Sequence, residues 1–251
     1  MKCMVFAAGL GTRLRPITDT LPKALVRVGE QTLLDITLSR LAEAGADEAV
    51  VNVHHHADIL RNYIQTHAFP LRVSVSDESQ RLLDTGGGLL HAAPFFGETS
   101  GHVLIHNVDI LSNLDIRRFY AEASAVPVML VTSQRETSRY LLFDEGDRLV
   151  GWTNVKTGEV KSPYADIVPA NCRHLAFNGI HAFSPALFPL LKSFAQSRGA
   201  EDAPFSIIDF YLAACRDVQI KAYTQPDLKI LDVGKVDALR QAEAFLQNCS
   251  K

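Results

Sequence analysis

The stretch AAGLGTRLRPITDTLPKALVRV, residues 7–28, decides how this 251-residue chain folds and what it can bind. A short apolar run precedes it, so a buried strand is expected to break into a loop at Gly9 and Gly11. Backbone N–H groups in such a glycine loop can approach a phosphate closely. Arg13 then offers a planar cationic fork, and Lys23 offers a point charge. The stretch therefore predicts a phosphate-binding loop after the first strand.

The distribution of charge favours a small polyphosphate over a nucleic acid as the ligand. Residues 10–28 hold four basic side chains and one acidic side chain, whereas the whole chain has a formal net charge of −3. One cationic loop on an acidic protein is typical of a site for a small anionic molecule. A nucleic-acid-binding protein is the less favoured alternative, since such proteins carry broad basic surfaces.

The loop also has a specific residue pattern. It consists of Gly9, Gly11, Thr12, Arg13, Leu14, Pro16, Pro22 and Lys23. This pattern resembles the GxGTRLxP loop and the following Pro-Lys pair of the sugar-1-phosphate nucleotidylyltransferases. It is not the P-loop pattern, because no Gly-Lys-Ser/Thr ends the loop. It is not the dinucleotide-binding pattern either, because Arg13 and Leu14 stand where a third glycine would be needed. A plain strand-to-helix turn with solvated arginines is the alternative.

Length and composition indicate a globular protein with a substantial core. The chain has 251 residues, of which 47% are hydrophobic and 21% are charged, and a chain of this length can bury roughly three quarters of its unfolded surface. We recognise no transmembrane segment or signal peptide, so no membrane partner is expected. The cysteines are Cys3, Cys172, Cys215 and Cys249. Their scattered spacing indicates reduced thiols in a cytoplasmic protein.

Apolar periodicity predicts strands that alternate with helices. Strands are expected at residues 3–7, 48–53, 71–75, 102–105, 127–131 and 139–143, and helices at residues 33–42, 58–67, 115–123 and 241–247. The alternation predicts an α/β fold, a Rossmann-like three-layer αβα arrangement around a mostly parallel mixed sheet. A turn at residues 144–147 predicts a hairpin, so part of the second half is antiparallel.

We expect one domain over residues 1–251. By the resemblance, about residues 1–135 form a nucleotide-binding half, and about residues 136–251 form a sugar-binding half with a late metal-binding aspartate.

A second glycine-rich segment, DTGGG at residues 84–88, is expected to contact the nucleotide base. Glycine weakens a regular element by roughly 1 kcal/mol relative to alanine, so we expect a loop here and a helix that begins near Leu89. The resemblance places this segment beside the base. The candidate nucleotide contacts are Ala8, Gly9, Gly11, Thr12, Glu78, Gly86, Gly87 and Gly88. A flexible turn without a ligand is the alternative.

Two aspartates are candidate Mg²⁺ ligands. Asp109 follows an apolar run at residues 102–108, and ligands collect at the carboxyl ends of strands in open α/β sheets. Asp232 stands in a late Asp-x-Gly sequence that resembles the family's second carboxylate setting. Two carboxylates that meet can hold Mg²⁺ and leave positions for phosphate oxygens and water. For Asp109 the alternative is a helix cap, and for Asp232 it is a turn residue.

Asn178 and Gly179, in the sequence FNGIH, resemble the segment with which the family holds its sugar. Asn178 is expected to hydrogen-bond the sugar, and Gly179 to leave room for the ring, with a buried asparagine at a turn as the alternative. Larger relatives hold the sugar phosphate with a lysine before this segment. The comparable residues 152–154 contain none, and Lys156 is out of register. The histidines at residues 54–56 would alternate between the faces of a strand, so we do not expect them to share a metal ion.

The resemblance implies nucleotidyl transfer from UTP or GTP to a sugar 1-phosphate, with Mg²⁺ as the cofactor. The subgroup that resembles this chain most is that of the uridylyl- and guanylyltransferases for N-acetylmuramate, mannose and heptose 1-phosphates. Arg13 is expected to hold the β- and γ-phosphates, and Lys23 to lie near the α-phosphate or the sugar phosphate. A cytidylyltransferase for a non-sugar phosphate and a non-catalytic nucleotide-binding module are the alternatives. The oligomeric state and the number of Mg²⁺ ions stay open.

Overall fold

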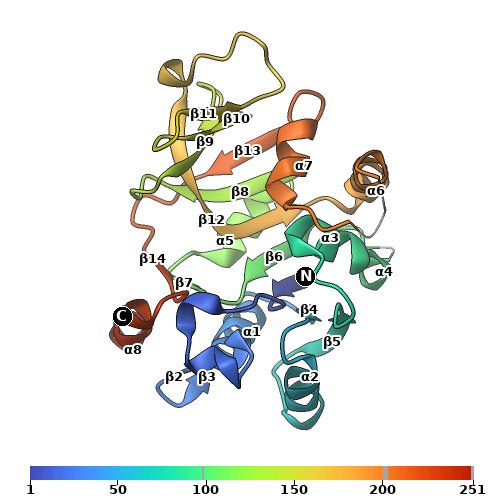
Figure 1. Cartoon of the computed structure of the whole chain (residues 1–251), viewed down its shortest axis with the longest axis vertical. Helices are drawn as coiled ribbons and strands as arrows, with labels where there is room; N and C mark the ends of the chain where they lie inside the picture. The colour runs from blue at the N-terminus through green and yellow to red at the C-terminus, as the bar shows by residue number, and fades with distance from the viewer. Residues whose placement is uncertain (98, 200–202, 250–251) are drawn as a thin grey trace.

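The computed structural model describes residues 1–97, 99–199 and 203–249, and within these ranges a ten-stranded mixed sheet runs through both halves of the chain (Figure 1). The strands are β1 Lys2–Phe6, β2 Arg27–Val28, β3 Gln31–Thr32, β4 Glu48–Val53, β5 Arg72–Asp77, β6 Val103–Asn107, β7 Ile110–Ser112, β8 Val128–Ser133, β9 Arg139–Phe143, β10 Leu149–Asn154, β11 Glu159–Lys161, β12 Arg173–Phe183, β13 Ile220–Tyr223 and β14 Ile230–Asp232. The α-helices are α1 Leu33–Glu43, α2 Ala57–Thr66, α3 Asp84–His91, α4 Ala93–Phe96, α5 Ile116–Ala123, α6 Phe188–Ser197, α7 Ile207–Ala214 and α8 Val236–Cys249.

Parallel strands in the order β5–β4–β1–β6 form the amino-terminal part of the sheet. After Lys2, strand β1 is apolar at every residue, as expected of a strand that helices cover on both faces. Cys3 and Val5 join the core on one face, whereas Met4 and Phe6 join the core on the other. The loops that follow these parallel strands all leave from one edge of the sheet. That edge is where open α/β sheets hold their ligands.

Strand β12 joins the parallel part of the sheet to an antiparallel part. Its last residues pair with β6 and β8, and its first residues pair with β9. Strands β9, β10 and β11 continue as an antiparallel ribbon, and β13 lies parallel to β8. The register of β12 against β8 shifts between Phe177 and His181, and Gly179 has a φ of 71° there. Asn178 and Gly179 therefore lie at an irregular point in the longest strand.

Helices lie on both faces of the sheet, which confirms the predicted three-layer αβα architecture. One core contains buried side chains from α1, α2, α5 and α8, and the other contains buried side chains from α3, α6 and α7. The C-terminal helix α8 packs beside β2, β7 and β14, so the end of the sequence returns to elements of the first half (Figure 1). Within the described residues, none of the helices combines the length and the apolar character needed to cross a membrane.

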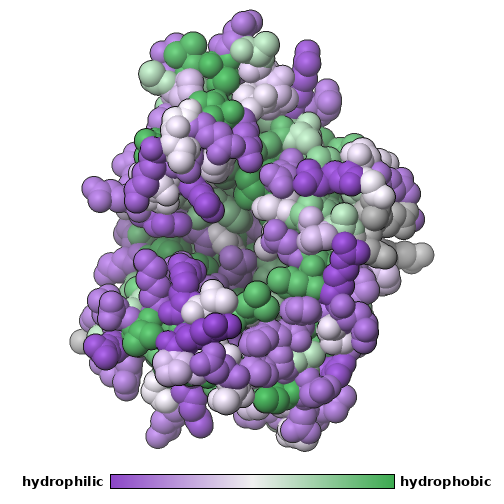
Figure 2. Space-filling model, in the orientation of Figure 1, coloured by the Kyte–Doolittle hydropathy of each residue, from purple (hydrophilic) through white to green (hydrophobic). Residues whose placement is uncertain are grey.

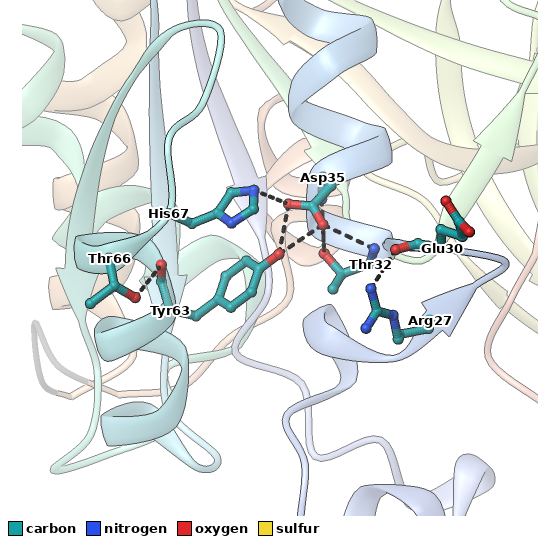
Figure 3. A network of polar contacts seen from close by, with 7 residues as sticks. All are labelled: Arg27, Glu30, Thr32, Asp35, Tyr63, Thr66 and His67. Atoms are coloured by element: carbon teal, nitrogen blue, oxygen red, sulfur yellow. Dashed lines mark hydrogen bonds and ion pairs between the residues drawn. The ribbon is translucent and has the colours of Figure 1, made fainter.

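A polar network ties α1 to α2 (Figure 3). Asp35 forms a capping box with Thr32 at the start of α1. The Tyr63 hydroxyl of α2 donates to Asp35 Oδ2 over 2.8 Å, and His67 Nε2 lies 3.5 Å from Asp35 Oδ1. Burial, together with the hydrogen bond to Asp35, raises the pKa of Tyr63. These contacts fix the angle between two helices that cover the same face.

The predicted elements of the parallel core and the hairpin are confirmed. The predicted strands at residues 48–53 and 139–143 coincide with β4 and β9. At the hairpin, the Asp147 N–H donates to the Asp144 carbonyl over 3.1 Å. The predicted loop at residues 84–88 is wrong, because α3 begins at Asp84 and includes the glycine triplet.

Candidate active site

A cavity of about 470 Å³ opens at the carboxyl ends of β1 and β6, and we call it the strand-end cavity. Figure 2 shows one face of the molecule hollowed between the upper and lower parts of the fold, with hydrophilic residues along the rims. The predicted site residues among those that line the strand-end cavity are Ala8, Gly9, Lys23, Glu78 and Asp109. The structure therefore brings together residues from four separate parts of the first half of the sequence.

Lys23 and Asp109 form an ion pair in this cavity. A short 3₁₀ turn at Lys23–Leu25 follows Pro22, and buried Ala24 and Leu25 anchor it. The Lys23 ammonium donates to Asp109 Oδ2, and the two side chains are 12% and 16% exposed. A largely buried pair of this kind keeps a cation and a carboxylate in fixed positions beside the ends of the strands.

Arg13 and Asp232 form a second, more exposed pair. Arg13 Nη2 lies 3.7 Å from Asp232 Oδ2, and the side chains are 54% and 47% exposed. Solvent screens such a pair strongly, so it contributes little to stability and can exchange for a ligand. Arg13 and Asp232, like Gly11 and Thr12, are not among the residues that line the strand-end cavity.

The chain places Asp232 next to Asp109 through backbone pairing. Strand β14 pairs antiparallel with β7, and Asp232 lies opposite Ile110. The N–H of Val233 donates to the Asp109 carbonyl over 2.8 Å. The backbones of the two distant aspartates therefore lie side by side, and Arg13 and Lys23 of the cationic loop each contact one of them.

Asn52 and Glu78 form a buried polar pair at the base of the cavity. Asn52 Oδ1 accepts the backbone N–H groups of Ala7 and Ala8 over 2.7 and 3.3 Å. Asn52 Nδ2 donates to Glu78 Oε1 over 2.8 Å, and Leu83 N–H donates to Glu78 Oε2 over 3.3 Å. Burial raises the pKa of Glu78 despite these hydrogen bonds. The pair fixes the start of the phosphate loop and the wall of the cavity together.

The glycine triplet packs against other parts of the protein. A Cβ at Gly88 would lie 2.7 Å from Glu78 Oε1, and a Cβ at Gly86 would overlap the Phe205 ring. The Gly86 N–H donates to the Phe205 carbonyl over 2.8 Å. Gly86 and Gly87 are not among the residues that line the strand-end cavity, so their expected contact with a base would require a rearrangement of α3. Asp84 and Thr85 line the cavity instead.

Four polar residues that line the strand-end cavity were not predicted as site residues: Asn52, Asp84, Thr85 and Asn107. Asn52 and Asn107 carried a usable signal, since each is a polar residue near the end of an otherwise apolar strand. Asp84 and Thr85 were not selected because residues 84–88 were predicted to be a loop in which the glycines contact the base.

The two predicted sugar residues lie beside different cavities. Asn178 is 1% exposed, and its Oδ1 accepts hydrogen bonds from Ser133 and Arg135. Gly179 lies against Asn107 of the strand-end cavity, where a Cβ would come within 2.6 Å of Asn107 Nδ2. A second cavity of about 500 Å³, which we call the ribbon cavity, lies against β9, β10, β11 and α7 and is lined in part by Arg135 and Trp152.

Comparison with known proteins identifies the family. A family model described as nucleotidyl transferase matches residues 2–249. The chain belongs to the nucleotidyl transferase family. This nucleotidyltransferase is 30% identical over 253 residues to N-acetylmuramate alpha-1-phosphate uridylyltransferase of Caulobacter vibrioides, with 97% of this chain and 96% of the relative covered. It is 29% identical over 147 residues to mannose-1-phosphate guanyltransferase of Aspergillus oryzae, with 56% of this chain and 40% of the relative covered.

Solved structures share the fold of this nucleotidyltransferase. The crystal structure of UDP-glucose pyrophosphorylase complexed with UDP-glucose superposes with a TM-score of 0.74 at 16% sequence identity, and 98% of each chain is covered. The predicted family, fold class and enzyme class are confirmed. Among the described residues, no group of three or more His, Cys, Asp or Glu side chains is arranged to hold a metal ion.

Proposed function

We propose that this protein transfers a nucleotidyl group from an NTP to a sugar 1-phosphate and releases pyrophosphate. The observation that supports this most directly is the convergence of Lys23, Asp109, Arg13 and Asp232 at the ends of the strands. A full-length relative is named for transfer of a uridylyl group to N-acetylmuramate 1-phosphate. We therefore favour UTP, with GTP as the second choice, and one domain divided near residue 135.

The residues of the site have separate roles in this proposal. An oxygen of the sugar phosphate attacks the α-phosphorus in line with the bond that breaks, and pyrophosphate leaves. Lys23 neutralises charge at the α-phosphate, and Arg13 holds the leaving phosphates. No general base is needed because the attacking phosphate is already anionic near pH 7. Alignment and charge neutralisation then account for the catalysis.

Asp109 and Asp232 suit Mg²⁺. This ion is commonly held by one or two carboxylates together with substrate phosphates rather than by a complete protein cage. The two acids lie on paired segments, and each has a cationic partner that a metal ion can replace. When bound, Mg²⁺ would withdraw negative charge from the phosphates and help to align them.

Asn52 and Glu78 face the cavity from β4 and from the segment after β5, and we propose that they lie at the nucleoside. Ala8 and Gly9 would lie beside the phosphates. Gly11, Thr12, Gly86 and Gly87 remain weaker candidates, since they do not line the strand-end cavity. All four cysteines are free, which fits a cytoplasmic protein.

The proposal is tested by pyrophosphate release. Each of the four NTPs is combined with N-acetylmuramate 1-phosphate, mannose 1-phosphate, glucose 1-phosphate or choline phosphate, with Mg²⁺ or with EDTA. We expect Mg²⁺-dependent release with UTP or GTP and a sugar phosphate. Release only with CTP and choline phosphate would indicate the cytidylyltransferase alternative. NTP binding without pyrophosphate release from any pair would indicate a non-catalytic binding module.

A further inference from the structure

The ribbon cavity adjoins the strand-end cavity and has a different character. Thr85 Oγ1, from a residue that lines the strand-end cavity, accepts the N–H of Ile207 over 2.9 Å at the start of α7. Ser206, the residue before Ile207, lines the ribbon cavity. The two cavities therefore lie on either side of one short segment. An acceptor substrate that lies across this segment would reach both cavities.

Arg135 presents a positive charge to the ribbon cavity. Its Nε donates to Asn178 Oδ1 over 3.1 Å, and its Nη2 donates to the Phe177 carbonyl over 3.2 Å. Both acceptors are uncharged, so they orient the guanidinium and leave its charge in place. Within the described residues, no carboxylate lies within ion-pair distance of Arg135. A planar guanidinium held in this way is suited to bind an oxyanion with its remaining N–H groups.

Asn178 is built into the fold as the support for Arg135. It lies at the irregular point of β12 and is 1% exposed. Its Oδ1 also accepts the Ser133 hydroxyl over 3.2 Å, which fixes the position of that oxygen. Gly179, the next residue, packs against Asn107 of the strand-end cavity. Arg135 is thus held where β12 passes between the two cavities.

The other charges in the ribbon cavity do not replace Arg135. Lys161 is shared between Glu159, at 3.5 Å, and the face of Trp152, at 5.2 Å. Arg139 also lines this cavity, but among the described residues no hydrogen bond or ion pair orients its guanidinium. Asn178 orients the guanidinium of Arg135, and among the described residues no carboxylate neutralises its charge.

We propose that Arg135 binds an oxyanion of the acceptor substrate and that Asn178 is its positioning residue. This rests on the proposed function, since it assigns a group of the molecule that receives the nucleotidyl group. Two sources supply such an oxyanion. One is the 1-phosphate that every sugar phosphate carries, and the other is a carboxylate on an acidic sugar.

The first test replaces Arg135 and measures steady-state pyrophosphate release. We expect Arg135→Met to raise the KM for the acceptor by about 10- to 100-fold, the size of a charge-assisted hydrogen-bonded contact. The KM for the NTP should stay within about twofold. Arg135→Lys keeps the charge but loses the fork, so an intermediate KM is expected. Arg118→Met, on the exposed face of α5, is the matched control and should leave both constants unchanged.

The second test separates charge from orientation. Asn178 Nδ2 is buried and has no hydrogen-bond partner among the described residues. Asn178→Asp therefore breaks no hydrogen bond from that nitrogen, but it places a carboxylate against Arg135 and neutralises its charge. We expect an acceptor KM close to that of Arg135→Met and an unchanged KM for the NTP, and circular dichroism checks that the variant folds. Asn178→Ala should raise the acceptor KM less, because the charge stays.

Two acceptors distinguish the sources of the oxyanion. N-acetylglucosamine 1-phosphate and N-acetylmuramate 1-phosphate differ by one lactyl ether, which carries a carboxylate. A rise in KM for both acceptors in Arg135→Met assigns the guanidinium to the phosphate, and a rise only for the second assigns it to the carboxylate. An active wild type whose acceptor KM values do not change in Arg135→Met or Asn178→Asp overturns the inference. A wild type without pyrophosphate release from any pair overturns the proposed function instead.

Discussion

The backbone N–H of Val233 donates to the carbonyl of Asp109 over 2.8 Å. This single hydrogen bond extends the pairing of β14 with β7 to the point where both aspartates stand. Asp109, which follows β6, and Asp232, which ends β14, are therefore held together by the same set of backbone hydrogen bonds. Their relative position depends on the C-terminal part of the chain as much as on the phosphate loop.

Removal of either partner of the buried ion pair should abolish most of the activity. We expect Lys23→Ala and Asp109→Asn each to lower turnover by about 100-fold or more, since one preorganised charge contributes about 3 kcal/mol to a transition state. Pyrophosphate release measures turnover, and circular dichroism checks the fold. Arg118→Ala is the matched control, because Arg118 pairs with Glu122 on the surface of α5. Near-normal turnover in both variants would contradict the assigned roles.

Replacement of the second acid should change the dependence on the metal ion. We expect Asp232→Asn to raise the Mg²⁺ concentration for half-maximal pyrophosphate release by about tenfold or more, a loss of about 1.4 kcal/mol. A titration of Mg²⁺ at constant NTP measures this shift. Treatment with EDTA should stop release in both proteins, and added Mg²⁺ should restore it. If pyrophosphate release depended on the Mg²⁺ concentration identically in the two proteins, Asp232 would not be a ligand of the metal ion.

Gly88 should be intolerant of a methyl group although it lies in a helix. Alanine is the better helix former by about 1 kcal/mol, but its Cβ would lie 2.7 Å from Glu78 Oε1 and 3.2 Å from Asn52 Nδ2. We expect Gly88→Ala to lower the free energy of unfolding by about 1–3 kcal/mol in urea denaturation. Gly9→Ala is the control for stability, since a Cβ there meets no atom within 4 Å. A Gly88→Ala protein as stable as the wild type would show that α3 can shift freely.

Glu78 should give stability a specific dependence on pH. Burial raises its pKa above the ordinary value of 4.5, so the folded protein binds this proton more readily than the unfolded chain does. The ionised carboxylate therefore costs stability at neutral pH, and the cost disappears as the pH falls below the ordinary carboxyl pKa. We expect the difference in unfolding free energy, Glu78→Gln minus wild type, to decrease from about pH 7 to about pH 4. Parallel curves for the two proteins would contradict this.

The parallel core was predictable because its signal is local. The consecutive apolar side chains of β1 and the apolar run of β4 predict strands without any knowledge of the rest of the fold. Strand β12 was missed because Asn178 and Gly179 interrupt its apolar pattern and favour a turn. The strand continues through them because, on the far side, pairing with β8 resumes and pairing with β6 begins.

The site was predictable where a charge or a motif marked it. Lys23 and Asp109 stood out in the sequence, and the structure joins them. The glycine triplet was wrongly predicted to be a loop. Tertiary packing outweighs the low helix propensity of glycine, and Phe205, against which the triplet packs, lies far away in the sequence. Arg135 carried no local signal, since only the fold gives it Asn178 as a partner.

The pairing of β14 with β7 also sets the order in which a growing chain can become active. Strands β1, β4 and β6, which form the base of the strand-end cavity, leave the ribosome early. The segment that carries Asp232 follows nearly all of the other strands and helices. A nascent chain that has folded its first half would hold Lys23 and Asp109 together yet lack the second acid. If Asp232 holds the metal ion as proposed, the pair of acids is complete only after β14 has been made.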